Sequence, residues 1–237
     1  MNINKDTYNE LIIRLYGSNH SNLQEKLCKY NADNLVVISN TDREVRPNET
    51  NGIEHIFITK DAAIDLLQKR NPIAKTEING NLYFVLEEDL HKKLIYIIDP
   101  NGINSLKSSF IADKYIFKTI YIEADMIDRI NRAANRGDSP IDFYKRTTSE
   151  DKQFKKFEED LLLDGSLCDL VINTSESSLV DNVWKCFTFM EKELCKNKDK
   201  KPLMFLVAGR TNAGKDTIVT FCAALLELVI KLKIRKE

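Results

Sequence analysis

Short apolar runs alternate with helical patterns along this chain of 237 residues. Each run is rich in β-branched or aromatic residues and is bounded by turn residues, which is typical of a buried strand. The runs are residues 35–39, 56–58, 94–98, 116–122, 169–172 and 203–208. Strands that alternate with helices form a mainly parallel sheet with helices packed on its faces. The sequence therefore predicts an α/β fold.

The helices are predicted from apolar residues spaced at i, i+3, i+4 and i+7. Near the start of the chain this spacing is met by Tyr8, Leu11, Ile12 and Leu15. Ser177 is expected to cap a later helix, because a serine hydroxyl accepts a hydrogen bond from the first turn. Further helices are predicted up to about residue 30, over 61–70, over 103–108, over 125–160 with a break near 137–140, and after residue 214.

Composition excludes several classes of protein. The chain has 35 Lys and Arg against 36 Asp and Glu, and 43% of its residues are hydrophobic. A balanced charge argues against a nucleic-acid binder, and this apolar content is too high for a disordered chain. The longest apolar run, 221–230, contains Glu227 and is too short to span a membrane. We expect no nucleic-acid or membrane partner.

The cysteines and the N-terminus indicate a cellular compartment. The five cysteines have no CxxC spacing, so neither a zinc site nor a disulfide framework is indicated. The N-terminus has no apolar core of signal-peptide length. We therefore expect free thiols and a cytoplasmic protein. We also expect the protein to be a monomer or a homodimer.

A glycine-rich turn follows the last apolar run. The nine residues from Gly209 to Thr217 read Gly-Arg-Thr-Asn-Ala-Gly-Lys-Asp-Thr and satisfy the pattern GxxxxGK between a strand and a helix. Backbone N–H groups of such a loop surround phosphate oxygens, and the helix N-terminus and the lysine add positive charge. The alternative is an ordinary strand-to-helix turn. The predicted ATP-binding residues are Gly209, Asn212, Ala213, Gly214, Lys215, Asp216 and Thr217.

Asp216 stands where a serine or threonine normally helps to hold magnesium, and Thr217 follows it. We expect these two residues to contact the Mg²⁺ that accompanies ATP.

A second group of polar residues follows the run 35–39. Arg43 and Arg46 are three residues apart in a loop, a spacing that suits bidentate binding of a phosphate group. The alternative for this pair alone is a solvated loop.

Residues 39–57 resemble the acceptor-binding loop of guanylate kinases, S-x-T-T-R-x-x-R-x-x-E-x-x-G-x-x-Y-x-F. Asp42 replaces the second threonine of that pattern, and His55 replaces its tyrosine. The resemblance runs from residue 35 to about 194. Further matches follow in order at residues 79–83 (G-N-x-Y), 98–102 (I-D-x-x-G), 132–137 with Arg146 (lid arginines), and 169–173 (D-x-V-I-x-N).

This resemblance implies a P-loop kinase-like three-layer fold. It would have a mainly parallel five-stranded sheet, a small subdomain for a nucleoside monophosphate, and a helical lid. It also implies ATP- and Mg²⁺-dependent phosphoryl transfer to GMP, dGMP or another nucleoside monophosphate. The implied catalytic residues are Lys215, Arg132, Arg136 and Arg146; the alternative for these arginines is a solvated helix face. The implied acceptor-binding residues are Ser39, Arg43, Arg46, His55, Tyr83 and Asp99.

Two positions depart from the family. Its guanine-reading glutamate aligns with Ala74, and its guanine-reading serine or threonine aligns with Val85. The expected readout of guanine is therefore missing, and Thr76 or Glu77 would have to replace it. The same losses are compatible with a catalytically inactive binding module, which is the alternative function.

The order of the segments also departs from the family, because guanylate kinases begin with the phosphate loop. A circular permutation is one explanation, since residues 196–201 can span up to ~20 Å to the start of a central strand. The alternative is a truncated second kinase unit behind a decayed first one, whose remnant would be residues 11–17 with 18–27. A strand over 11–16 is the alternative to the first helix, but it would bury Arg14. The expected organisation is 1–34 helical, 35–195 kinase-like body (35–93 acceptor region, 125–160 lid), and 202–237 completing the core.

Overall fold

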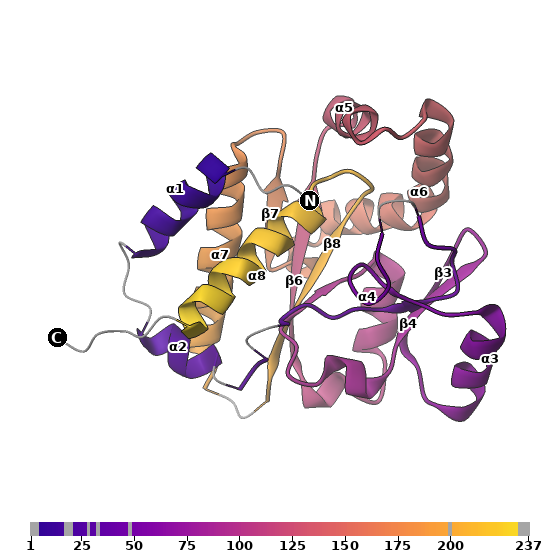
Figure 1. Ribbon diagram of the computed structural model, residues 1–237, viewed down its shortest axis with the longest axis horizontal. Coiled ribbons are helices and arrows are strands. Elements are labelled where there is room, and N and C mark those ends of the chain that lie inside the picture. The colour runs from indigo at the N-terminus through magenta and orange to yellow at the C-terminus, as the bar shows by residue number, and fades with distance from the viewer. Residues whose placement is uncertain are drawn as a thin grey trace.

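The computed structural model describes residues 5–16, 21–27, 29–31, 34–46, 49–198 and 201–231. Strands β5 (Ile95–Ile97), β8 (Leu203–Gly209), β6 (Ile116–Glu123) and β7 (Leu170–Asn173) form one parallel sheet in that order (Figure 1). β8 pairs with β6 over its whole length and with β5 on its other side. The predicted α/β class and the central place of the last apolar run are confirmed.

The fifth strand expected over 35–39 is reduced to a single parallel bridge. Val36 pairs with Ile95, and the Val37 N–H donates to the Ile95 oxygen at 2.8 Å. The segment lies beside β5 only briefly, because the next residues, Asn40–Thr41 (β1), already belong to another sheet.

Helices cover both faces of the large sheet, giving the three layers expected (Figure 1). Alternate β8 side chains face opposite layers, and all of its residues are buried. One layer comprises α7 (Leu179–Lys196), α8 (Lys215–Lys231), α1 (Lys5–Tyr16) and α2 (Ser21–Leu27). The other comprises α4 (Pro100–Lys107) and α6 (Pro140–Leu163).

α1 is the helix predicted from the spacing of apolar residues. Leu11 and Leu15 are buried against the core, whereas Ile13 is 72% exposed. The alternative strand over 11–16 is therefore wrong. Residues 17–20 and part of the connector 196–201 lie outside the described residues.

The small sheet belongs to the region expected to bind the acceptor. Its order is β2 (Ile56–Phe57), β1, β4 (Asn81–Val85) and β3 (Ile73–Ile78), with α3 (Lys60–Lys69) beside it (Figure 1). Short 3₁₀ turns lie at Glu87–Leu90, Ala112–Lys114 and Gly165–Leu167.

The break predicted in the long helical stretch is confirmed. α5 (Met126–Arg136) ends at Gly137, whose φ of 86° suits glycine, and Ser139 caps α6. The cap predicted at Ser177 is wrong, because Ser178 caps α7 and the Ser177 hydroxyl instead donates to the Asn182 side chain. Among the helices of the described residues, none is long and apolar enough to cross a membrane.

Candidate functional site

The glycine-rich loop connects the carboxyl end of β8 to α8. Asn212 and Gly214 have φ values of 61° and 96°, so the backbone curls through the left-handed region twice. A side chain at Gly209 would put its Cβ 2.4 Å from the Ile122 oxygen, which explains why glycine ends β8. The loop therefore has the strand–turn–helix context that a phosphate-binding loop requires.

Lys215 is the first residue of α8, and its side chain is 21% exposed. Its ammonium lies 3.9 Å from the Asp216 carboxylate. The first N–H groups of a helix have no partner inside that helix, so the N-terminus of α8 offers donors and a positive dipole beside the lysine.

Asp216 is the carboxylate that fits a magnesium ion at this place. Its side chain is 62% exposed in the first turn of α8. Within the described ranges, no three acidic, histidine or cysteine residues are grouped to hold a metal by themselves. Mg²⁺ is usually bound by one or two carboxylates together with substrate phosphates, which suits a single aspartate next to Thr217.

Arg132 of α5 contacts the backbone of the loop. Its guanidinium donates to the oxygens of Asn212 and Ala213 at 3.3 and 3.1 Å, and to the Thr174 hydroxyl at 2.8 Å. The Thr174 hydroxyl lies 2.8 Å from the Ala213 oxygen as well. Arg132 thus lies at the loop, as predicted, but its donors are bonded to protein oxygens.

Arg43 is the centre of the predicted acceptor region. Its guanidinium donates to both Glu49 oxygens at 2.8 and 2.9 Å and to the Tyr83 hydroxyl at 3.0 Å. Burial alone would raise the pKa of Glu49, but the bonds from Arg43 and from the Arg46 N–H bring that pKa below its ordinary value. These contacts fix the loop that carries both arginines.

His55 joins the same group of residues. Its Nδ1 is hydrogen-bonded to the Ser39 hydroxyl at 2.9 Å, and its ring meets Tyr83 edge-on at 5.5 Å. Burial, followed by the charge of Arg43, lowers the pKa of His55. This shift favours the neutral form of the imidazole. Ser39, Arg43, His55 and Tyr83 are brought together as the sequence predicts.

Arg46 lies in the same loop as Arg43, and its pKa also responds to an arginine of α6. Its side chain is 47% exposed, and its guanidinium is 3.5 Å from Glu49. Burial lowers the pKa of Arg46, and the positive charges of Arg43 and of Arg146 on α6 lower it further. Arg146 and Arg136 in turn both pair with Asp138. The predicted lid arginines 136 and 146 thus meet at one carboxylate.

The carboxylate of Asp99 forms hydrogen bonds with neighbouring groups of the protein. It caps α4 by accepting from the N–H groups of Asn101 and Gly102 at 2.9 and 3.1 Å, and it accepts from the Thr76 hydroxyl at 3.0 Å. Burial raises the pKa of Asp99, although these hydrogen bonds oppose the shift. Its carboxylate therefore orients α4 and β3 next to the strand ends.

Ala74 and Val85 are both buried in an apolar cluster with Leu90 and Tyr96. The side chains of Ala74 and Val85 have no group that could form a hydrogen bond with a base. The Thr76 hydroxyl, one of the two suggested replacements, is bonded to Asp99.

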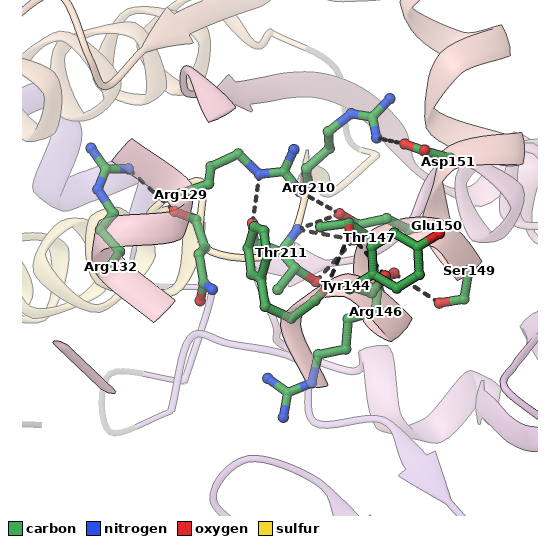
Figure 2. A network of polar contacts seen from close by, with 12 residues as sticks. Arg129, Arg132, Tyr144, Arg146, Thr147, Ser149, Glu150, Asp151, Arg210 and Thr211 are labelled. Carbon is green, nitrogen blue, oxygen red and sulfur yellow. Dashed lines mark hydrogen bonds and ion pairs between the residues drawn. The ribbon is translucent and has the colours of Figure 1, made fainter. Parts of the chain in front are cut away.

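Sequence reasoning missed a further group at the phosphate loop. Arg129, Glu150, Arg210 and Thr211 form a network of polar contacts between α5, α6 and the loop (Figure 2). The only sequence signal was the spacing of Arg129 and Arg132, which puts two arginines on one face of a helix.

Comparisons with known proteins agree with the resemblance. The family model for guanylate kinase matches residues 11–181, a range that leaves out the loop at 209–217. Guanylate kinase of Chlamydia trachomatis serovar D is 27% identical over 119 residues, which cover 48% of this chain and 56% of that protein. The chain thus spans little more than half the length of this curated relative.

Two other proteins match more of the chain. Guanylate kinase of Acinetobacter baylyi is 24% identical over 198 residues, covering 77% of this chain and 94% of that protein. A crystal structure of guanylate kinase from Anaplasma phagocytophilum is similar with a TM-score of 0.48 at 16% identity, over 75% of this chain and 83% of that one. Because the family model matches most of the chain, this protein belongs to the guanylate kinase family.

Proposed function

We propose that the protein transfers the γ-phosphoryl group of ATP to a nucleoside monophosphate. The observation that carries the proposal is the loop between β8 and α8, which passes twice through the left-handed region and puts Lys215 at a helix N-terminus. In addition, the charge of Arg146 on α6 lowers the pKa of Arg46 in the loop after β1. Positive charges that converge from separate elements are costly unless an anion joins them. Membership of the guanylate kinase family supports nucleotides as the anions.

ATP would be held by the loop and Lys215. The N–H groups at the start of α8 would bind phosphate oxygens, and Lys215 would neutralise charge that develops on the transferred group. Mg²⁺, when bound next to Asp216 and Thr217, supplies further neutralisation of the phosphate oxygens. No covalent nucleophile is needed, because positioning and charge stabilisation account for this reaction class.

The acceptor phosphate would be held by Arg43 and Arg46, together with Ser39, His55 and Tyr83. Arg43 is already oriented by Glu49 and Tyr83, so little side-chain freedom is lost when the acceptor binds. A neutral His55 can accept or donate one hydrogen bond beside these charges without adding to their repulsion.

The acceptor base is the part of the proposal that departs from the family. GMP and dGMP are the expected acceptors, but Ala74 and Val85 are packed in the core and offer no polar group. We therefore expect weak discrimination among bases.

The residues that complete the phosphate loop argue for catalysis over a binding module, since a module that binds only protein partners has no use for Gly214 and Lys215.

The same proposal includes the origin of the segment order. β8, the loop and α8 would be the first segments of a guanylate kinase moved to the end of the chain by circular permutation. The place of β8 between β5 and β6, and the helical state of the described residues 11–16, support this over a second, truncated kinase unit.

The test is an ADP-release assay with Mg·ATP and each ribo- and deoxynucleoside monophosphate. We expect turnover with at least one monophosphate and a preference of less than about tenfold for guanine. A strong preference for guanine would contradict the reading of Ala74 and Val85. Absence of turnover with every monophosphate, together with absence of Mg·ATP binding in calorimetry, would favour the inactive module.

A further inference from the structure

Thr211, in the middle of the phosphate loop, has all of its polar groups bonded to two side chains of α5 and α6 (Figure 2). Its N–H and its hydroxyl both donate to one Glu150 oxygen at 2.9 Å. Its own oxygen accepts from Arg129 Nε at 2.8 Å. Residues 61 positions apart in the chain therefore determine the orientation of this peptide unit.

Glu150 and Arg129 also bind each other. Arg129 donates to Glu150 at 2.6 Å, and the two side chains are 3% and 10% exposed. A buried pair of this kind contributes little net stability compared with apolar residues of similar size, whereas its loss leaves an unpaired buried charge. Its contribution is therefore better sought in the geometry that it imposes on Thr211.

The contacts of α5 continue along the loop. Arg129 holds the oxygen of residue 211, and Arg132, one turn later, holds the oxygens of 212 and 213. In a trans peptide the N–H points away from the C=O of the same unit. Fixing these oxygens towards α5 consequently turns the N–H groups of Asn212, Ala213 and Gly214 away from α5, and that of Ala213 donates to the Arg210 oxygen at 3.1 Å.

Arg210, the residue before Thr211, is also held by side chains of α6. Arg210 donates to both Glu158 oxygens at 2.7 and 2.8 Å and to Asp151 at 2.5 Å. Its guanidinium also lies over the Phe154 ring at 5.6 Å. The chain is thus fixed by side chains immediately before the two positions with positive φ.

We infer that Glu150 and Arg129 are positioning residues that set the shape of the phosphate loop and thereby the affinity for ATP. The inference rests on the proposed function for the identity of the ligand. Both side chains would act through Thr211 and would not touch the phosphates of ATP themselves. α5 and α6 form the region expected to be the lid. The contacts of Thr211 would therefore couple the lid helices to the ATP site.

The first experiment compares Glu150→Gln with Glu159→Gln by calorimetry with Mg·ATP. In Glu150→Gln an amide group replaces one acceptor oxygen and faces donors of Thr211 or Arg129. We expect the Kd for Mg·ATP to rise at least tenfold, while the KM of the acceptor stays within twofold. Glu159 is exposed on the same helix, so its variant should leave both values within twofold.

A second pair of variants tests the same contact with little risk to folding. Thr211→Val removes the hydroxyl that donates a hydrogen bond to Glu150, whereas Thr211→Ser keeps that hydroxyl. We expect Thr211→Val to weaken Mg·ATP binding about fivefold or more and Thr211→Ser to stay within twofold. Equal values for the two variants would overturn the inference, as would equal losses for ATP and acceptor in Glu150→Gln.

Amide hydrogen exchange without nucleotide separates this inference from the proposed function. Glu150→Gln should accelerate exchange in the peptide covering 209–216 relative to wild type and to Glu159→Gln. If the wild-type protein binds no Mg·ATP, the proposed function fails. The positioning role is then decided by the rate of amide exchange in the peptide 209–216 of Glu150→Gln. Unchanged exchange in that peptide would overturn the positioning role in either case.

Discussion

The phosphate loop and the small sheet both contain arginines, but they use them differently. At the loop, Arg129, Arg132 and Arg210 are bonded to backbone oxygens or to carboxylates. At the small sheet, Arg46 is half exposed, 3.5 Å from Glu49, and close to the charge of Arg146. The comparison indicates that arginines of the first region hold the backbone of their loop, and that Arg43 of the second region does the same for its own loop. The half-exposed Arg46 is the better candidate to contact a ligand directly.

The largest effect is expected at Lys215, the cation of the first region that does offer its charge. Lys215→Ala should lower kcat at least 100-fold, about 2.7 kcal/mol, because its interaction strengthens in the transition state. Lys215→Arg should rescue poorly, since a planar fork does not replace a compact charge in a tight loop. Lys231→Ala, at the other end of α8, is the control, and equal turnover in the Lys215 and Lys231 variants would remove Lys215 from the mechanism.

The second effect concerns Arg46 in the small sheet. Removing a charge-assisted contact with the acceptor phosphate should cost about 2–3 kcal/mol. The KM for the acceptor should therefore rise roughly 30–150-fold in Arg46→Ala, with the KM for ATP nearly unchanged. Arg70→Ala, an exposed arginine that pairs with Glu88, is the matched control. An acceptor KM within twofold of wild type for every active monophosphate would show that Arg46 does not bind it.

Arg43→Ala is a poorer probe of the same site. Arg43 also holds Glu49, Tyr83 and the Glu44 oxygen, so its loss would disturb the loop itself.

The third effect is on stability and concerns the backbone of the first region. In Gly209→Ala the new methyl group would meet the Ile122 oxygen, and overpacking of this kind costs about 1–3 kcal/mol. Gly165→Ala is the control, because a Cβ there meets nothing within 4 Å. Denaturant unfolding of both variants measures the difference; an equal free energy of unfolding for the two would mean that the close approach of β8 and β6 is not required.

The smallest effect is expected at Glu49, which orients the arginines of the small sheet. Glu49→Gln should cost about 1 kcal/mol at pH 7, because glutamine keeps one oxygen that can accept from Arg43 while the charge of the pair, whose side chains are 11% and 14% exposed, is lost. The lowered folded-state pKa of Glu49 contributes stability that is present above the ordinary pKa of about 4.3 and is lost as the pH falls further. Melting temperatures from pH 7 to pH 3 should therefore converge for wild type and variant; a constant difference would contradict the pKa direction.

The two regions were also unequally predictable from the sequence. β8, the loop and α8 follow from local signals, namely an apolar run, two glycines at fixed spacing and a helical pattern. The loop with Arg43 and Arg46 was identified from short-range spacing together with the family pattern. The α/β alternation needs only patterning, which is why it was predicted without any knowledge of contacts.

The side-chain contacts that hold the glycine-rich loop could not be predicted. Nothing near Glu150 or Thr211 signals that they meet, because their contact depends on how α6 packs beside β8. The bonding of Arg132 to loop oxygens and the capping by Asp99 are tertiary details of the same kind. The segment 35–39 has the composition of a strand, but it forms only one bridge with the large sheet, because the chain then enters the small sheet as β1.

The central claim is that the phosphate loop and the small sheet form a single phosphoryl-transfer site. Adenosine joined through five phosphates to the nucleoside of the best acceptor tests it directly, because both regions must bind one molecule at once. If the regions face each other, calorimetry should give a Kd at least about 100-fold lower than that of Mg·ATP or of the monophosphate alone. A Kd no lower than that of Mg·ATP would contradict the account, since the two regions would then bind independently.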